Sequence, residues 1–187
     1  MGSTVAAVAA ARRRSERDLS DPVGAVSRNQ RRALITVIVT ASWAGAAMLV
    51  VSTVAPAAFK VLPTRALAGA LVGQVLPVVF VAGLVAGVLA LVMAARGAPR
   101  STLRRIGAAG TIAGCAVAQM VIGPRIAALR ERIGPSVEAL ALTDPLRVEF
   151  GKLHGFSVLA LGVAMVFALI TLVAAALAVR DTPVLHD

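Results

Sequence analysis

Acidic, aromatic and cysteine residues are scarce in this sequence. Its 187 residues include nine Asp and Glu, one Cys, one Trp and no Tyr. The single cysteine, Cys115, excludes an intrachain disulfide and any multi-cysteine metal site. Although the net charge is +10, aromatics make up only 3%, so no stacking platform accompanies the arginines. We therefore expect no nucleic-acid partner.

Charged residues of either sign are also rare. They make up 15% of the chain, against about 25% in soluble domains, whereas hydrophobic residues make up 58%. The mean hydropathy is +0.86. A chain of this length cannot hide so much apolar surface in one small core. The composition therefore predicts an integral membrane protein, with the lipid bilayer as its main partner.

Four windows lack Asp, Glu, Lys and Arg altogether: Ala33–Phe59, Ala66–Ala95, Ile106–Pro124 and Leu153–Val179. About 20 residues of helix cross a hydrocarbon core of ~30 Å, where backbone groups must pair internally. We therefore predict an all-α, integral membrane four-helix bundle. Its domain covers residues 31–180, with spans at about 33–55, 66–95, 105–123 and 154–179.

The segments outside this domain are polar. Residues 1–30 are rich in Ala, Arg and Ser and show no sustained period, and we expect a disordered, arginine-rich cytoplasmic tail. Residues 181–187 are expected to form a short cytoplasmic tail. The apolar run Val5–Ala11 precedes the arginines, the reverse of a signal peptide. A multispan protein of a bacterial-type inner membrane is the simplest interpretation.

Positive charge predicts the orientation. With a cytoplasmic N-terminus, twelve basic residues lie on the cytoplasmic side and seven on the other side. Lys and Arg favour the cytoplasmic side of a membrane protein. We therefore expect both termini to be cytoplasmic.

Two sequence features predict helix boundaries on the outer side. Gly123-Pro124 interrupts the third span, and Ile126, Leu129 and Ile133 then repeat at helical spacing. This pattern predicts that the helix restarts as a short amphipathic piece. Asp144-Pro145 is typical of an N-cap followed by the first residue of a helix. The last helix should therefore begin well before its apolar window.

Gln74 and Gln119 are the main polar groups within the spans. They are candidates for interhelical hydrogen bonds, and the alternative is that they line a path for a substrate. The four charge-free windows hold no charged residue, which argues against a proton pump. Glycines recur at four-residue spacing, which suits close helix packing within the bundle or, alternatively, a dimer interface. These pairs are Gly69/Gly73, Gly83/Gly87 and Gly110/Gly114.

No motif for catalysis, for phosphate binding or for a metal is present. Only His154 and His186 are histidines, and His186 follows the last span, so haem ligation by two histidines between spans is excluded. We expect no cofactor, no metal site and no enzymatic activity. A lipid-modifying enzyme that works through His154 is the least favoured alternative.

Three stretches together resemble the DUF4149 family, which includes the transmembrane protein 205-like proteins. They are residues 54–63, residues 123–126 and residues 150–157, the last of which contains Leu153-His154 and Ser157 in an "LHxxS" arrangement. The resemblance covers roughly residues 33–180. It implies four membrane helices and an outer loop between the third and the fourth.

The resemblance also implies a candidate outer-rim polar cluster of Arg125, His154 and Ser157. His154 and Ser157 are three residues apart and share one helix face. They either bind an anion or a lipid headgroup together with Arg125, or only hold helix ends together. We expect a non-enzymatic structural, accessory or partner-binding bundle that binds other membrane protein subunits. The alternative is a small transporter or permease subunit, with a path between helices or protomers.

Overall fold

The computed structural model describes residues 28–94, 98, 100–134 and 136–181. Four helices in it are long and apolar enough to cross a membrane: Arg28–Val61, Arg65–Met93, Ser101–Ile133 and Pro145–Arg180. The prediction of an all-α protein with four candidate membrane spans is thereby confirmed. The predicted tail at residues 1–30 lies outside the described residues up to residue 27, and the first helix begins at Arg28. Residues 182–187 of the second predicted tail also lie outside them.

Three of the four helices are longer than their charge-free windows, and the second has nearly the length of its window. The first is α-helical from residue 28 to residue 49 and continues through a π-helical turn, η1 (Val50–Val54), into α2 (Ala55–Val61). The second is α3 (Arg65–Met93). The third consists of α4 (Ser101–Ala116), a π-helical turn η2 (Val117–Ile122) and α5 (Gly123–Ile133). A short 3-10 turn, η3 (Val137–Ala139), precedes α6 (Pro145–Arg180).

Both π-helical turns end just before a proline. Pro56 is near the start of α2 and Pro124 near the start of α5. A proline lacks the N–H that would bond to the carbonyl four residues back, and its ring clashes with that carbonyl. A wider turn before the proline relieves this conflict. The interruption that Gly123-Pro124 predicted is therefore a wide turn, after which the helix continues as the predicted amphipathic piece.

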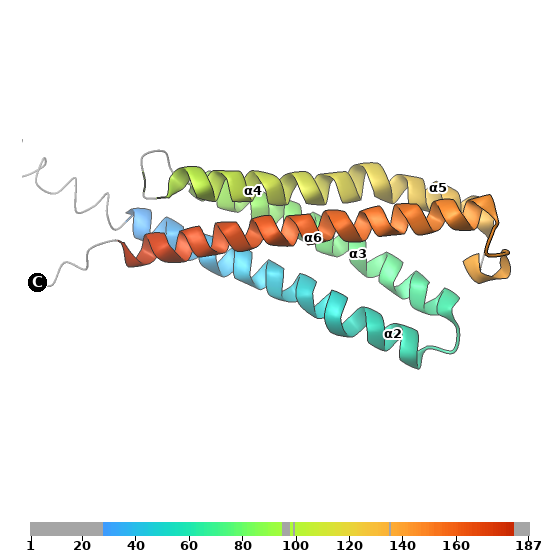
Figure 1. Cartoon of the computed structure of the whole chain (residues 1–187). Coiled ribbons are helices and arrows are strands. Elements are labelled where there is room, and N and C mark those ends of the chain that lie inside the picture. The colour runs from blue at the N-terminus through green and yellow to red at the C-terminus, as the bar shows by residue number, and fades with distance from the viewer. Residues whose placement is uncertain (1–27, 95–97, 99, 135, 182–187) are drawn as a thin grey trace, which may run out of the picture.

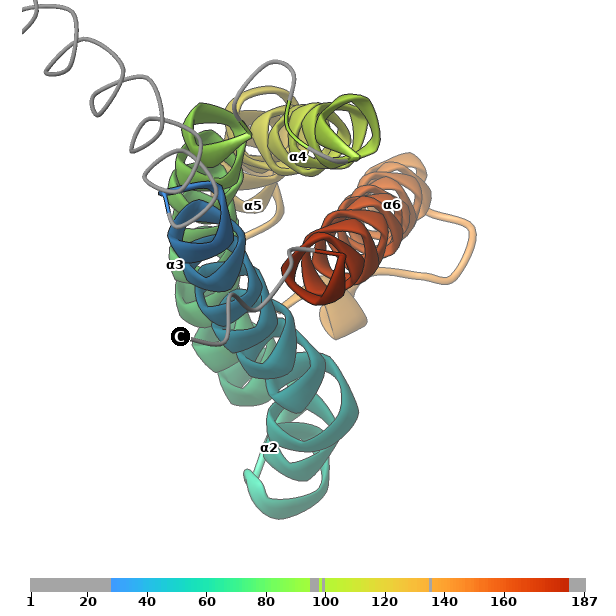
Figure 2. The ribbon, with the colours of Figure 1, turned by 90° about the vertical axis from the view of Figure 1, so that its left-hand side faces the viewer.

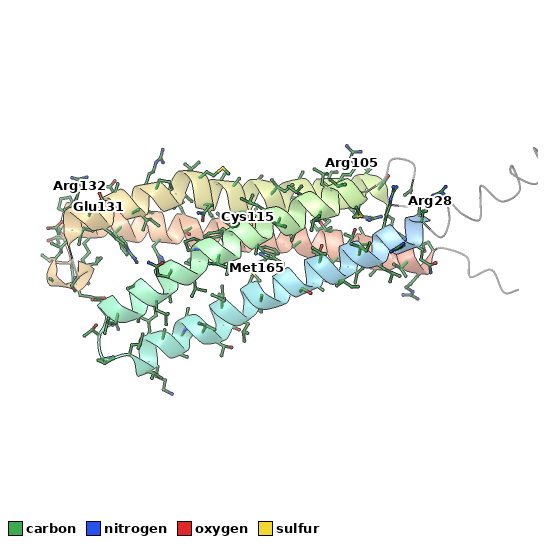
Figure 3. All side chains as sticks on the ribbon, turned by 180° about the vertical axis from the view of Figure 1, so that it is seen from behind. Arg28, Arg105, Cys115, Glu131, Arg132 and Met165 are labelled. Atoms are coloured by element: carbon green, nitrogen blue, oxygen red, sulfur yellow. The ribbon has the colours of Figure 1, made fainter. Side chains whose placement is uncertain are left out.

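The four helices form two hairpins. The first helix pairs with α3, and the α4–α5 helix lies along α6 (Figure 1). Viewed along the bundle, α3 lies beside α4, and α2 projects away from α6 (Figure 2). The hairpins approach each other at one end and diverge toward the end where α2 and α5 lie. Arg28 and Arg105 are at the close end, and Glu131 and Arg132 are at the divergent end (Figure 3). We name these the Arg104 end and the Arg130 end, after the arginines described below.

The interior is filled mainly by small side chains. Buried alanines and glycines dominate it, including Ala47, Ala86, Ala90, Ala108, Ala164, Ala168 and Ala174. A Cβ atom on Gly114 would lie 2.9 Å from the carbonyl oxygen of Ala160, and one on Gly83 would lie 2.5 Å from Sγ of Cys115. Small residues allow helix backbones to approach this closely in membranes. Of the two roles left open for these glycines, close packing within the bundle is confirmed for Gly83 and Gly114.

The start of α6 agrees with its sequence signal. Asp144 is the N-cap, Pro145 is the first helical residue, and Oδ1 of Asp144 accepts a hydrogen bond from the backbone N–H of Leu146 at 2.8 Å. At 1.5 Å per residue, the 36 residues of α6 extend about 54 Å, well beyond a hydrocarbon core. The helix is therefore long enough for its ends to extend beyond the bilayer.

Candidate functional site

The predicted outer-rim cluster lies at the Arg130 end, but its three members differ in their surroundings. Arg125, near the start of α5, is exposed, and so is His154 on α6. Ser157, one turn after His154, is buried. No hydrogen bond joins the three residues in the part of the chain that the structure describes.

Arg130 on α5 organises this end. Its Nη2 donates a hydrogen bond to the carbonyl oxygen of Gly69 on α3 at 3.1 Å. Its guanidinium carbon lies 5.6 Å from the ring centroid of Phe150, within the range of a cation–π interaction. The ring of Phe150 in turn stacks on His154, with 6.4 Å between centroids and 4° between planes. Arg130 thus links the two hairpins where they diverge, and connects His154 to this link.

The sequence of α3 makes room for this arginine. A Cβ atom on Gly73 would lie 2.7 Å from Nη1 of Arg130, so a side chain there would displace the guanidinium. Pro77, four residues after Gly73, lacks the N–H that would bond to the carbonyl of Gly73. The guanidinium therefore sits where α3 has no side chain and where the helix leaves a carbonyl without its usual donor.

Arg104 holds the opposite end together from inside the bundle. It is 1% exposed and lies in the first turn of α4. Its Nη2 donates to Oγ1 of Thr36 on the first helix at 2.9 Å and to the carbonyl oxygen of Met93, the last residue of α3, at 3.4 Å. A cation at a helix C-terminus is favourable. Three helices therefore meet at one guanidinium.

Three buried threonines lie next to a void deeper in the bundle. Thr40, Thr111 and Thr171 line a narrow void together with Trp43 and small residues of α3 and α4, and the void has no room for a water molecule. Thr111 and Thr171 donate to carbonyls of their own helices. Oγ1 of Thr40 is buried without a hydrogen-bond partner.

The two candidate interhelical amides lie in different environments. Gln74 on α3 is exposed on the outer surface of the bundle, and Gln119 on η2 is half-buried. Within the described ranges, no hydrogen bond joins them to each other or to another group. The surface of α3 around Gln74 is apolar, with Leu71 and Val78 both exposed.

Sequence reasoning missed the two arginines that join the helices. Arg104 follows a loop in the sequence and was counted as a flanking charge, whereas the structure places it inside the third helix. Arg130 belongs to the loop predicted between the third and fourth spans. The signals that pointed to it were indirect: the glycines at positions 69 and 73, and Phe150 four residues before His154. None of these predicts a partner without a three-dimensional arrangement.

No group of three or more His, Cys, Asp or Glu residues that could hold a metal ion occurs among the described residues. The fold and the two arginine links define a multispan helical membrane protein. Residues 38–134, about half of the chain, match the family described as Domain of unknown function (DUF4149), and the chain belongs to that family. The family resemblance noted in the sequence is thereby confirmed over residues 38–134, which include the first two of its three stretches. No match was found among curated proteins or solved structures.

Proposed function

We propose that the protein is a non-enzymatic accessory subunit, which binds the membrane-embedded helices of other proteins through the outer surface of α6. The observation that carries this proposal is the placement of the glycines of α6. Gly151, Gly155 and Gly162 are exposed, and a Cβ atom built on any of them would meet nothing within 4 Å. Spacings of four and seven residues place them on one helix face.

This face differs from the glycines that pack the interior. Gly83, Gly107 and Gly114 each lie against another helix of the same chain. A glycine in a helix interior is less favourable than alanine by ~1 kcal/mol. Three glycines on an open face therefore destabilise α6 unless the backbone of another helix packs against them. Between membrane helices, small residues allow such an approach and the packing contacts it brings. A helix from another protein is the expected occupant.

The test is affinity isolation of the full chain from native membranes after mild solubilisation. We expect a defined set of membrane proteins to be retained by the wild type and lost with Gly155→Leu. A Cβ atom added at Gly155 would meet nothing within 4 Å, and the position is exposed, so the fold is expected to persist. Val163→Leu, at an exposed position on the flank of α6, is the matched control and should retain the set. Identical retention by Gly155→Leu, or no retained protein at all, would contradict the proposal.

A small transporter or permease subunit is the second candidate. The half-buried position of Gln119 supports it, because an amide there lies near the junction of α3, α4 and α6. This function predicts uptake of small polar solutes into vesicles that contain the purified protein, and loss of that uptake with Gln119→Leu. Vesicles that remain as tight as protein-free vesicles would exclude it.

The proposed setting is a bacterial-type inner membrane with both termini in the cytoplasm. The excess of basic residues on the N-terminal side supports this orientation. In a Cys115→Ala background, a membrane-impermeant thiol reagent should label Lys60→Cys in intact cells and Thr102→Cys only after permeabilisation. Both positions are exposed, so accessibility reports the side of the membrane. The reverse pattern would overturn the orientation.

A further inference from the structure

The exposed face of α3 has a regular composition that the accessory function on α6 does not use. Its residues recur at alternating spacings of four and three over more than three heptads. All of them are exposed, and all but one are aliphatic: Leu67, Leu71, Gln74, Val78, Val81, Val85, Val88 and Val92. This is the spacing of the contact seam in left-handed helix pairs. Gln74 is the single polar member.

Gln74 lies at a depth where its amide needs a partner. The 29 residues of α3 extend about 43 Å, so a centred hydrocarbon core of ~30 Å begins roughly 7 Å from either end. Gln74 is about 14 Å from the start of α3 by the same rise per residue, which places it inside the core. Neither water nor a neighbouring helix of the chain reaches it, since it is exposed and makes no hydrogen bond within the described residues. An unpaired amide in hydrocarbon is costly.

We propose that a second copy of this chain covers the α3 face, in a parallel two-fold dimer whose two Gln74 side chains bond to each other. Two copies inserted in the same orientation have parallel α3 helices, so residue 74 of one lies level with residue 74 of the other. A glutamine amide carries both a donor and an acceptor, so two of them pair reciprocally across a two-fold axis.

The residues around Gln74 on the α3 face also suit contact with a second copy of the chain. Aliphatic side chains above and below it would interdigitate with their own copies, and a single polar residue in such a seam fixes its register. Lys60 and Arg65 lie at the end of the first hairpin and are both positively charged. In the dimer they would repel the same residues of the second copy. They are exposed, so they extend into water where their repulsion is screened. The seam below them is uncharged.

Cross-linking tests the geometry. In a Cys115→Ala background, full-length protein carrying Gln74→Cys or Val78→Cys, reconstituted in lipid vesicles, should form disulfide-linked dimers under mild oxidation. Val121→Cys, exposed on η2 of the other hairpin, is the control and should remain monomeric. Cross-linking through Val121 but not through position 74 would place the contact elsewhere and overturn the proposal.

Energy transfer between labelled copies tests the amide pair. Over a series of protein-to-lipid ratios, Gln74→Leu should weaken self-association by roughly three- to tenfold, the range expected for the loss of one to two interhelical hydrogen bonds. Gln74→Asn keeps the amide and should retain more of the association than Gln74→Leu. Wild-type protein that stays monomeric at every ratio, or a dimer unaffected by Gln74→Leu, would overturn the proposal. This dimer is independent of the α6 face: Gly155→Leu should leave it intact, and Gln74→Leu should leave partner retention intact.

Discussion

Thr36 and Thr40 lie one helical turn apart in the first helix, but only the hydroxyl group of Thr36 has hydrogen-bond partners. Oγ1 of Thr36 accepts from Arg104 at 2.9 Å and donates to the carbonyl of Arg32 at 2.9 Å. Oγ1 of Thr40 is buried with no partner. Removing a hydroxyl group that pairs with a buried charged donor leaves that donor unpaired and lowers the free energy of unfolding. Removing a hydroxyl group without a partner has no such effect. Identical substitutions at the two positions should therefore have different effects.

We predict that Thr36→Val lowers the free energy of unfolding by about 1–3 kcal/mol, because a buried guanidinium loses an acceptor. Thr40→Val has nearly the same shape and removes an unsatisfied polar group, so it should be neutral or stabilising. Thermal unfolding of both variants in one detergent measures the difference. Equal destabilisation by the two changes would show that the Arg104 contact contributes nothing specific.

At the scale of the elements, α4 and α6 approach each other closely because one of them carries glycine at the contact. A Cβ atom on Gly107 would lie 2.8 Å from the carbonyl oxygen of Phe167 and would clash with Oγ1 of Thr171. The backbone of α6 cannot yield as a flexible side chain can. The helices must therefore separate if any side chain is added at Gly107.

We predict that Gly107→Ala destabilises the bundle by about 1–3 kcal/mol, as expected for overpacking. Gly162→Ala, on the open face of α6, is the matched control and should be neutral or stabilising because alanine favours the helix. Comparing their unfolding in a denaturing detergent separates packing from helix propensity. Similar stability of the two variants would contradict the close approach.

The N-cap hydrogen bond of Asp144 holds the first turn of α6. Asp144→Ala should cost about 1 kcal/mol, whereas Asp144→Asn should cost little, because asparagine caps as well as aspartate. Hydrogen exchange at residues 145–150 should accelerate in Asp144→Ala and not in Asp144→Asn. Unchanged exchange in both would show that packing against α5 alone holds the first turns.

Much of this element structure could be predicted from sequence. The four charge-free windows predicted the helices and their order, because backbone groups in hydrocarbon must pair internally and a helix satisfies this. Asp144-Pro145 predicted the start of the last helix. The ends of the first and third helices were placed too near the ends of their windows. A charge-free window ends at the first charged residue, whereas the third helix includes Arg104 and Arg130, whose side chains find partners. Those partners come from other helices, and no local pattern encodes them.

At the scale of the whole molecule, Arg130 sets how far apart the hairpins lie at the divergent end. It reaches from α5 to the carbonyl of Gly69 and packs on Phe150. The η3 turn also contacts α3 at this end. Arg130 supplies the hydrogen bond that joins the hairpins here and a cation–π contact with Phe150 on α6.

We predict that Arg130→Met widens the distribution of distances between the hairpins at this end. Spin labels at Lys60→Cys and Ser136→Cys, in a Cys115→Ala background, measure this distance. Arg132→Met, an exposed neighbour on α5, is the control and should leave the distribution unchanged. A distribution in Arg130→Met that matches the wild type would show that the loops alone set the separation.

The packing around Gly83 has a practical consequence. The chain has one tryptophan, Trp43, whose Nε1 donates to the carbonyl oxygen of Val79 at 2.9 Å, and its ring lies against the same face of Gly83 as Sγ of Cys115. The indole, which belongs to the first helix, therefore lies where this helix meets α3 and α4. Its fluorescence is an intrinsic optical reporter of whether these three helices are assembled. Emission should shift to the red, and quenching by the thiol should be relieved, when they separate. The stability of the bundle can thus be followed without attaching any label.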